Sequence, residues 1–455
     1  MYRWMMVSLA CAVLLMFGCN ANPPAGEGSS ENSSADAAGA SGISWQSPIE
    51  VAEGEAHQGP WQMNDSDFRY VDAPTVALNN RGEANIGWID QEAQELYFQR
   101  FDEAGEPLLD DPVNVSQSPD IFSWLPRIAV DPEDDDRIYL LWQDIVFSGG
   151  SHGGEIFFAY SADGGESFGE PVNLSNTQAG AGKGRLTSDF WHNGSLDIAV
   201  NGNGDVIAVW TEYEGALRVS WSEDGGESFT EAVDIVSEAE GDPARGPSIA
   251  YHPDGTAYVA WTVGENHGGD VWLTSFSEGA DNFGEPRVIL ESDGHADGVN
   301  LAIDGEGTLH LVVGQSTTRM LETSVVEYAR STDGGESFTE AKTLAEADGD
   351  VGSKAFPALA IDGADRLYVV WERMPSAQER PVSLGFAMSE DRGDSFSAPE
   401  VVPGTGDDDL GFNGSLQGLL MQKVAARNEG QVAVVNSTFN EGERSLVRLI
   451  RGAFE

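Results

Sequence analysis

Short stretches in which apolar or small residues alternate with polar ones recur along this chain. One line appears in seven variants, among them "APTVALNNRGEANIGW", "SLDIAVNGNGDVIAVW" and "FPALAIDGADRLYVVW". In each variant an alternating stretch leads into a cluster of Gly, Asn and Asp, and a second apolar stretch follows. Because alternation is typical of a half-buried strand and such a cluster is typical of a turn, each line predicts a β-hairpin.

The spacing of these lines indicates repeated structural units. A small residue marks the same place in every line, and successive markers lie 52, 70, 51, 52, 58 and 65 residues apart. The markers are Ala77, Ala129, Ala199, Ala250, Ala302, Ala360 and Ala425. Repeats of this length are typical of propeller blades or solenoid units.

Each repeat continues with two more predicted strands. The third strand is written as in "EIFFAYS" or "SLGFAMS", and a short outer strand such as "EPVNLS" follows a recurring polar phrase. Four antiparallel strands in every repeat predict an all-β protein. Its fold is expected to be a β-propeller of four-stranded blades, because radial repetition protects the edges of the sheets.

The two ends of the chain decide the number of blades. The seventh line, from Met421, supplies three strands before Glu455, and "WQSPIEVAE" (Trp45 to Glu53) is similar to the outer strands of the other repeats. We therefore expect a seven-bladed ring closed by three C-terminal strands and one N-terminal strand. A six-bladed ring with the seventh repeat as an appendage is the alternative.

The recurring polar phrase identifies a family resemblance. "SADGGESF" begins at Ser161, and the pattern Ser-x-Asp-x-Gly-x-x-Phe returns in three further intact copies and two weaker ones, around Asp102 and after Ser277. The aspartates of the intact copies are Asp163, Asp224, Asp333 and Asp391. The phrase resembles the Asp-box, or BNR repeat, of the sialidase superfamily, and the resemblance covers residues 44 to 455. It implies a turn between the third and fourth strands, on the face away from the active site.

The residue types of the Asp-box favour a structural role over ligand or calcium binding. A carboxylate accepts hydrogen bonds from backbone N–H groups in a tight turn, and Gly adopts the positive φ that a Cβ would oppose. The aromatic residue at the end of the phrase is placed to close the hairpin. The Trp that ends most of the second strands is likewise expected to pack between blades.

The N-terminus reads as an export signal followed by a tether. Residues 1–18 carry Arg3 and an apolar run too short to span a bilayer as a mature helix. "LLMFGC" resembles a bacterial lipobox, which would make Cys19 the lipidated first residue of the mature protein, and "LAC" ending at Cys11 is a poorer match. Residues 19–43 are rich in Gly, Ser and Ala and predict a flexible tether, and residues 44–455 form the propeller. Asn20 after the cysteine implies the outer membrane by the same resemblance.

Composition excludes several classes of function. With 24 Lys and Arg against 76 Asp and Glu, the chain carries a formal charge of −52, which opposes binding to nucleic acid. Lysine occurs only at positions 183, 342, 354 and 423, and this preference for arginine resembles proteins adapted to salty surroundings. No cysteine follows Cys19, so disulfide and thiolate chemistry is excluded from the propeller. We expect a monomer without cofactors, with calcium at the acidic turns "PEDDDR" and "GDDDL" as a weak alternative.

The loops opposite the Asp-boxes are the predicted ligand site, because they are the least repetitive part of each blade. Aromatic side chains mixed with carboxylates and arginines suit sugar recognition by stacking and hydrogen bonding. The candidate binding residues are Arg69, Trp124, Arg127, Arg185, Trp191, His192, Arg245 and Lys354. The catalytic candidates are Asp189, Glu212 and Tyr213.

The resemblance leaves two functions open. Family sialidases grip the substrate carboxylate with three arginines and use a Tyr nucleophile with a Glu partner and an Asp acid. The usual Arg-Ile-Pro is absent here, and Tyr213 beside Glu212 is the best nucleophile pair the chain offers. Our first hypothesis is a lipid-anchored propeller that binds a carbohydrate or a protein at the cell envelope. An exo-α-sialidase is the alternative.

One further repeat raises a metal hypothesis. "SHGGEI" places His152 three residues before Glu155, and "NHGGDV" places His267 three residues before Asp270. A His and a carboxylate at this spacing could share a metal ion. Because blades two and four are not neighbours and a double glycine suits a hairpin turn, a structural explanation is preferred.

Overall fold

The computed structural model describes most of the propeller. The described residues are 41–146, 154–177, 180–187, 190–237, 243–263, 269–277, 283–292, 294–316, 324–345, 352–376, 379–407, 409–411 and 422–454, with the backbone alone for 185–187 and 190–193. Contacts separate a segment Met1–Ala37 from one compact unit, Ala38–Glu455, which contains all seven repeats. Among the described residues, no helix reaches the length and hydropathy that a membrane crossing needs.

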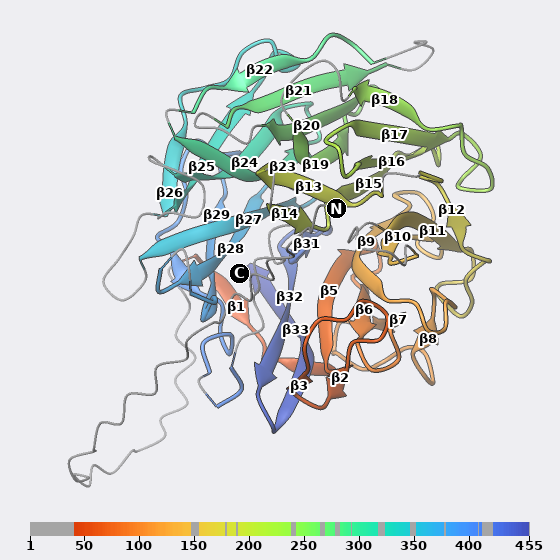
Figure 1. The fold of residues 1–455 in the computed structure, drawn as a ribbon. Helices are drawn as coiled ribbons and strands as arrows, with labels where there is room; N and C mark the ends of the chain where they lie inside the picture. The colour runs from red at the N-terminus through yellow and green to blue at the C-terminus, as the bar shows by residue number, and fades with distance from the viewer. Residues whose placement is uncertain are drawn as a thin grey trace, which may run out of the picture. The chain divides into compact units, whose positions relative to one another are not determined.

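The compact unit is a ring of seven blades (Figure 1), so the predicted seven-bladed propeller is confirmed. From the inner to the outer strand, blade 1 is β5 (Val71–Leu78), β6 (Ala84–Asp90), β7 (Glu95–Phe101) and β8 (Val113–Asn114), and blade 2 is β9 (Ser123–Val130), β10 (Ile138–Asp144), β11 (Glu155–Ser161) and β12 (Val172–Asn173). Blade 3 is β15 (Leu196–Val200), β16 (Val206–Thr211), β17 (Leu217–Ser222) and β18 (Val233–Val236), and blade 4 is β19 (Ala244–Tyr251), β20 (Ala257–Val263), β21 (Val271–Phe276) and β22 (Arg287–Leu290). Blade 5 is β23 (His295–Ile303), β24 (Leu309–Ser316), β25 (Ser324–Ser331) and β26 (Lys342–Ala345), and blade 6 is β27 (Ser353–Ile361), β28 (Leu367–Met374), β29 (Ser383–Ser389) and β30 (Glu400–Val401).

Blade 7 closes the ring with both ends of the chain. Its three inner strands are β31 (Val424–Ala426), β32 (Gln431–Asn440) and β33 (Arg444–Phe454). Its outer position is filled by β1 (Ile43–Trp45) and β2 (Ile49–Gly54), which both pair antiparallel with β33. The predicted N-terminal closing strand is therefore confirmed, although it is interrupted between the two segments.

Two small hairpins stand outside the blades. One joins β3 (His57–Gln58) to β4 (Phe68–Arg69), and the other joins β13 (Lys183–Thr187) to β14 (Phe190–Asn193). The second hairpin lies between the outer strand of blade 2 and the inner strand of blade 3. This inserted hairpin explains why the interval from Ala129 to Ala199, 70 residues, is the longest between the marker alanines of successive repeats.

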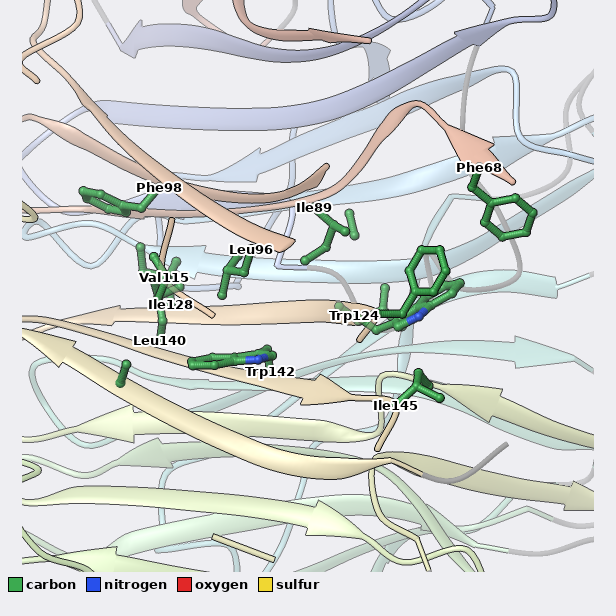
Figure 2. Packing of buried hydrophobic residues seen from close by; sticks show 14 of the residues in the cluster. Phe68, Ile89, Leu96, Phe98, Val115, Trp124, Ile128, Leu140, Trp142 and Ile145 are labelled. Atoms are coloured by element: carbon green, nitrogen blue, oxygen red, sulfur yellow. The ribbon is translucent and has the colours of Figure 1, made fainter. Parts of the chain in front are cut away.

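The apolar core lies between neighbouring blades. Trp142, Trp210, Trp261 and Trp371, at the ends of second strands, are at most 1% exposed, as the sequence predicts. In the cluster between blades 1 and 2, Leu96 of β7 lies near Ile128 and Leu140 of the next blade (Figure 2). Each blade thus buries its faces against its two neighbours, so that no blade is stable alone.

The four intact Asp-boxes share one hydrogen-bond pattern. In the first, the Ser161 hydroxyl donates to Asp163 at 2.7 Å and accepts from the Gly165 N–H at 2.8 Å, and the Ser167 hydroxyl donates to the other Asp163 oxygen at 2.6 Å. The same bonds recur at Asp224, Asp333 and Asp391. Hydrogen bonds from Ser337 lower the pKa of Asp333 to about 2. These bonds use the carboxylates to hold the turn.

The aromatic residue of the Asp-box joins two blades. The rings of Phe168, Phe229 and Phe396 lie 5.2, 4.7 and 4.9 Å from an aromatic ring on the third strand of the preceding blade. Their partners are Phe98, Phe158 and Tyr328. Such edge-to-face pairs add roughly 0.5–1.5 kcal/mol beyond the burial of their surface. In these three copies the phrase therefore fastens a blade to its predecessor as well as closing its own hairpin.

Replacing the second glycine of an Asp-box should destabilise the ring. Gly165 has φ +87°, and a Cβ there would lie 2.1 Å from the Phe98 ring. We expect Gly165→Ala to cost about 2–4 kcal/mol in free energy of unfolding, through backbone strain and overpacking. Gly169→Ala is the matched control, because its Cβ would meet nothing closer than 3.8 Å. Urea unfolding curves that coincide for the two variants would contradict this role.

Candidate functional site

All inner strands begin on one face of the ring, which we call the top face. It is defined by the first residues of these strands: Val71, Ser123, Leu196, Ala244, His295, Ser353 and Val424. Second strands end on this face because they run antiparallel to the inner strands. The Asp-box turns follow the third strands and therefore lie on the opposite face, as the resemblance implies.

A belt of polar side chains joins the inner strands around the ring axis. Asp197, Ser248 and Asn300 each accept a hydrogen bond from a backbone N–H of the next blade, at 2.9, 3.1 and 2.9 Å. Gln422 reaches past blade 1, accepting from the Thr75 hydroxyl at 3.0 Å and from the Ile128 N–H at 3.2 Å. We call these four side chains the central belt. They satisfy inner-strand N–H groups that no neighbouring strand reaches.

The central belt encloses a small polar cavity. Its volume is about 120 Å³, and its lining includes Arg127 together with the four belt residues. This is room for several water molecules, but it falls below the roughly 300–1,000 Å³ of ordinary ligand pockets. The cavity is therefore too small to hold a ligand larger than a few water molecules.

Five basic side chains are buried at the top face or at the central belt just below it, where Arg127 lines the cavity. They are Arg127, Lys183, Arg245, Lys354 and Lys423, each at most 5% exposed. We call them the top-face cations. In a chain with 24 basic and 76 acidic residues, burying five cations at one place is costly unless partners or ligands compensate their charge.

Two of the predicted arginines are held by the protein itself. Arg127 donates to the Pro126 carbonyl at 3.1 Å and lies 4.0 Å from Asp197, and burial lowers its pKa to about 10. Arg245 donates to Asp297 at 2.6 Å and to the Ala296 carbonyl at 2.8 Å. The two guanidinium groups therefore have separate sets of acceptors.

The third arginine of the expected triad lies elsewhere. Arg69 belongs to the β3–β4 hairpin, where its half-exposed side chain pairs with Glu55 at 2.9 Å and Asp67 at 3.2 Å. No shared carboxylate position follows from these three placements. The arrangement lends no support to the arginine triad of a sialidase.

Trp124 belongs to the core. It is 5% exposed, and its ring lies 5.6 Å from Trp61 and 6.1 Å from Phe122. Figure 2 shows it near Phe68 of β4 in the cluster between blades 1 and 2. A ring packed in this way has no free face on which a sugar could stack.

The Glu212–Tyr213 pair is divided between two environments. The buried Glu212 carboxylate lies 3.3 Å from Arg218 of β17, which also pairs with Asp234 at 2.8 Å. The Tyr213 N–H donates to the Gly180 carbonyl at 2.7 Å, and burial raises the pKa of its phenol. Glu212 is thus occupied within its own blade, whereas Tyr213 stays protonated at neutral pH.

Most of the remaining predicted residues lie at the β13–β14 hairpin, and Lys354 lies opposite another basic residue in its blade. Arg185 pairs with Trp191 in the hairpin, His192 pairs with Gly184, and Asp189 lies outside the described residues. Lys354, in β27, lies directly opposite Arg373 of β28 in the strand register. In Figure 1, β13 and β14 lie toward the middle of the ring, and β13 contacts β19 of blade 4.

Sequence reasoning missed two buried groups that bear on the site. Lys423 pairs with Glu372 at 3.2 Å and donates to the Phe356 carbonyl at 3.0 Å, and burial raises the pKa of Glu372. Lys183 lies in β13 and is 5% exposed, and burial lowers its pKa to about 7. The scarcity of lysine was the signal that could have found them, because three of the four lysines, Lys183, Lys354 and Lys423, are top-face cations.

The two carboxylates of the metal hypothesis have structural partners. Glu155 accepts from the Thr177 N–H at 3.0 Å, and Asp270 accepts from the Ser292 N–H at 3.1 Å. His152 and His267 lie outside the described residues. Within the part of the chain that is described, no group of three or more His, Asp or Glu side chains is arranged to hold a metal ion.

Comparison with known proteins identifies the fold. No family model matches the sequence, and no curated protein matches it. An ulvan lyase of a new polysaccharide lyase family, bound to -[GlcA(1-4)Rha3S]-, has a TM-score of 0.57 at 11% identity, covering 88% of this chain and 95% of its own. A second polysaccharide lyase has a TM-score of 0.53 at 11% identity, covering 90% of this chain and 100% of its own. A microbial sialidase reaches 0.44 at 13% identity, covering 67% and 64%.

These likenesses show the fold alone, because the identities are low. The propeller expected from the Asp-box resemblance is confirmed. The ulvan lyase and the second polysaccharide lyase act on glycans according to their descriptions.

One buried carboxyl group at the top face couples stability to pH. Asp144, at the end of β10, is 1% exposed and accepts from the Ser123 hydroxyl at 2.8 Å and the Trp142 indole at 2.7 Å. Burial raises its pKa from 3.8 to about 7. A carboxyl whose pKa is raised by folding stabilises the fold most at pH below about 4, and this stability is lost as pH rises through about 7.

Asp144→Asn should flatten this dependence. The amide keeps an acceptor for Ser123 and Trp142 but cannot ionise, so the variant should lose less stability than the wild type between pH 5 and 8, by an amount on the order of a few kcal/mol. Thermal unfolding across this pH range measures the effect. Asp90→Asn, at the same strand end in blade 1, is the matched control. Parallel wild-type and Asp144→Asn profiles would contradict the assignment.

Proposed function

We propose that this protein binds an acidic polysaccharide at the top face of its propeller. The observation that carries the proposal is the gathering of five buried cations at one face of a chain whose net charge is −52. Cations removed from water attract an anion far more strongly than exposed ones do. A carboxylate or sulfate group on a sugar is the kind of anion that such a site would hold.

The fold neighbours support this choice of ligand. One of them is described with -[GlcA(1-4)Rha3S]-, a repeat that carries both a uronate carboxylate and a sulfate. The second is described as a polysaccharide lyase. Since both share the propeller with this chain, we take a uronate-containing polysaccharide as the first ligand class to test.

A neutral glycan or an exo-α-sialidase substrate is less well supported. Trp124, the aromatic residue predicted to stack on a sugar, is buried in the core. Arg69 pairs with Glu55 in the β3–β4 hairpin and is not one of the top-face cations, so the arginine triad of a sialidase is not supported. Electrostatic recognition of charged sugars is what the remaining geometry offers.

We further propose that the protein acts at the cell envelope as a lipid-anchored monomer. The support is the lipobox-like "LLMFGC" and the Gly/Ser/Ala-rich tether, which is followed by the compact unit from Ala38. An outer-membrane anchor would hold the propeller among extracellular polysaccharides. Cys19→Ser should move the full-length protein from the membrane fraction to the soluble fraction, and its retention on membranes would argue against lipidation.

Binding to acidic polysaccharides should exceed binding to neutral ones at least tenfold. The binding affinity would be measured by affinity electrophoresis and calorimetry with ulvan, polygalacturonate and alginate, and dextran would serve as the neutral comparison. Because the attraction is electrostatic, affinity should fall as salt is raised. Equal affinity for dextran, or no dependence on salt, would refute the proposal.

A matched pair of variants locates the site. Arg373→Gln removes a half-buried cation that lies opposite Lys354 in the strand register at the top face. It should weaken binding roughly tenfold or more, which is the effect of losing one charge-assisted hydrogen bond. Lys342→Gln removes a cation whose ammonium group donates to the Gly393 and Asp394 carbonyls of an Asp-box turn on the opposite face, and it should leave binding unchanged. The reverse result would place the ligand on the Asp-box face.

A further inference from the structure

The central cavity is lined largely from one position that recurs in every repeat. This position is two residues before the marker alanine, and the seven repeats place there Thr75, Arg127, Asp197, Ser248, Asn300, Ala358 and Lys423. Arg127, Asp197, Ser248 and Asn300 line the cavity. Gln422 lines it beside them, whereas its neighbour Lys423 pairs with Glu372. The cavity therefore has one basic side chain, one acidic side chain and two amides in its wall.

The two amides direct their oxygen atoms toward the protein. The Asn300 oxygen accepts from the Leu359 N–H at 2.9 Å. The Gln422 oxygen accepts from the Ile128 N–H at 3.2 Å and from the Thr75 hydroxyl at 3.0 Å. Because a backbone N–H only donates, these bonds identify the oxygen of each amide. The NH₂ groups are then the polar atoms that the two amides have left for the cavity.

These NH₂ groups are poorly satisfied by the protein. The Asn300 amide nitrogen lies 3.5 Å from the Ser248 hydroxyl oxygen, and among the described residues the Gln422 amide nitrogen has no hydrogen-bond partner. Arg127 donates to two carbonyls, of Pro126 at 3.1 Å and Gly194 at 3.3 Å, and a guanidinium has further N–H groups to give. Three side chains therefore offer hydrogen-bond donors to one cavity.

The acceptors in the cavity wall are already engaged. The two Asp197 oxygens accept from the N–H groups of Ile198 at 3.0 Å and Ile249 at 2.9 Å. Ser248 accepts from a backbone N–H of the next blade. Arg127 lies 4.0 Å from Asp197 and offsets its charge. A metal cation needs oxygen ligands that are free to turn toward it, so this wall favours an anion over a cation.

We propose that the central cavity binds a small inorganic anion of the size of chloride, held by Arg127, Asn300 and Gln422. The cavity measures about 120 Å³, and a halide ion is about as large as a water molecule, whose share of the liquid is roughly 30 Å³. Hydrogen bonds to a charged acceptor are stronger than those to a neutral one. This site is separate from the polysaccharide site proposed on the top face and does not depend on it.

A bound anion would couple salt to the closure of the ring. Arg127 belongs to blade 2, Asn300 belongs to blade 5, and Gln422 directly precedes the inner strand of blade 7. Because these segments meet only in the folded ring, an anion held by all three stabilises the folded state by mass action. The formal charge of −52 opposes an anion at long range, but salt screens that field. We therefore expect chloride to stabilise the protein beyond the general effect of ionic strength.

Bromide tests the site directly, because it is close to chloride in size and scatters X-rays anomalously. In crystals of the full-length protein grown in bromide, an anomalous peak should lie in the cavity within hydrogen-bond distance of the Arg127, Asn300 and Gln422 nitrogens. In solution, the thermal midpoint should rise by a few degrees when chloride replaces gluconate, which is too large for the cavity, at constant ionic strength. A cavity that holds only water, or equal midpoints in the two salts, would overturn the proposal.

Two variants test the donors without removing the hydrogen bonds between blades. Asn300→Asp and Gln422→Glu keep the accepting oxygen and replace the NH₂ group with a carboxylate oxygen, which repels an anion. Each should lose the bromide peak and lower the affinity for chloride at least tenfold. The thermal midpoint in gluconate reports whether each variant is folded.

Asn114→Asp is the matched control. It makes the same change in the outer strand β8, where the Asn114 oxygen accepts from the Gln117 N–H at 3.1 Å. This variant should keep both the bromide peak and the response to chloride. An unchanged response in folded Asn300→Asp and Gln422→Glu, or an equal loss in Asn114→Asp, would show that the cavity donors do not bind the anion.

Discussion

The hydrogen bonds of the central belt are the constraint on which the rest of this propeller depends. The innermost strand of each blade has one edge without a partner strand, and its N–H groups need acceptors. Asp197, Ser248 and Asn300 provide them from one blade to the next, and Gln422 does so from blade 7 to blade 2. These bonds bring the seven inner strands to a common height. The pairing of β1 and β2 with β33 then closes the ring at its outer edge.

A common height for the inner strands explains how one face can collect charge. Residues 50 or more positions apart reach the same place because each repeat contributes the start of one strand. Arg245 meets Asp297 of the next blade and Lys423 meets Glu372 of the previous one. The belt keeps the floor of the face polar but too narrow for a sugar chain. The difference between blades lies in the insertion before blade 3, the β13–β14 hairpin, which brings in Lys183.

The fold was predictable because its causes are local and repeated. The alternation of apolar and polar residues predicts the strands. The Asp-box predicts a turn, and the same hydrogen bonds hold that turn in all four intact copies. The site was less predictable because burial and pairing depend on residues from other blades. The sequence assigns Trp124 and Arg245 to ligand-binding loops, yet they lie in strands β9 and β19, where Trp124 belongs to the core and Arg245 is bound by Asp297. The longest interval between markers pointed to the insertion that holds Lys183, and the scarcity of lysine gave a second signal.

A structure of the full-length protein with a bound acidic oligosaccharide tests the central claim most directly. A uronate ring should lie on the top face, with its carboxylate toward the buried cations. A ligand held on the Asp-box face, or on the outer strands, would contradict the account. So would a uronate on the top face whose carboxylate points away from the buried cations.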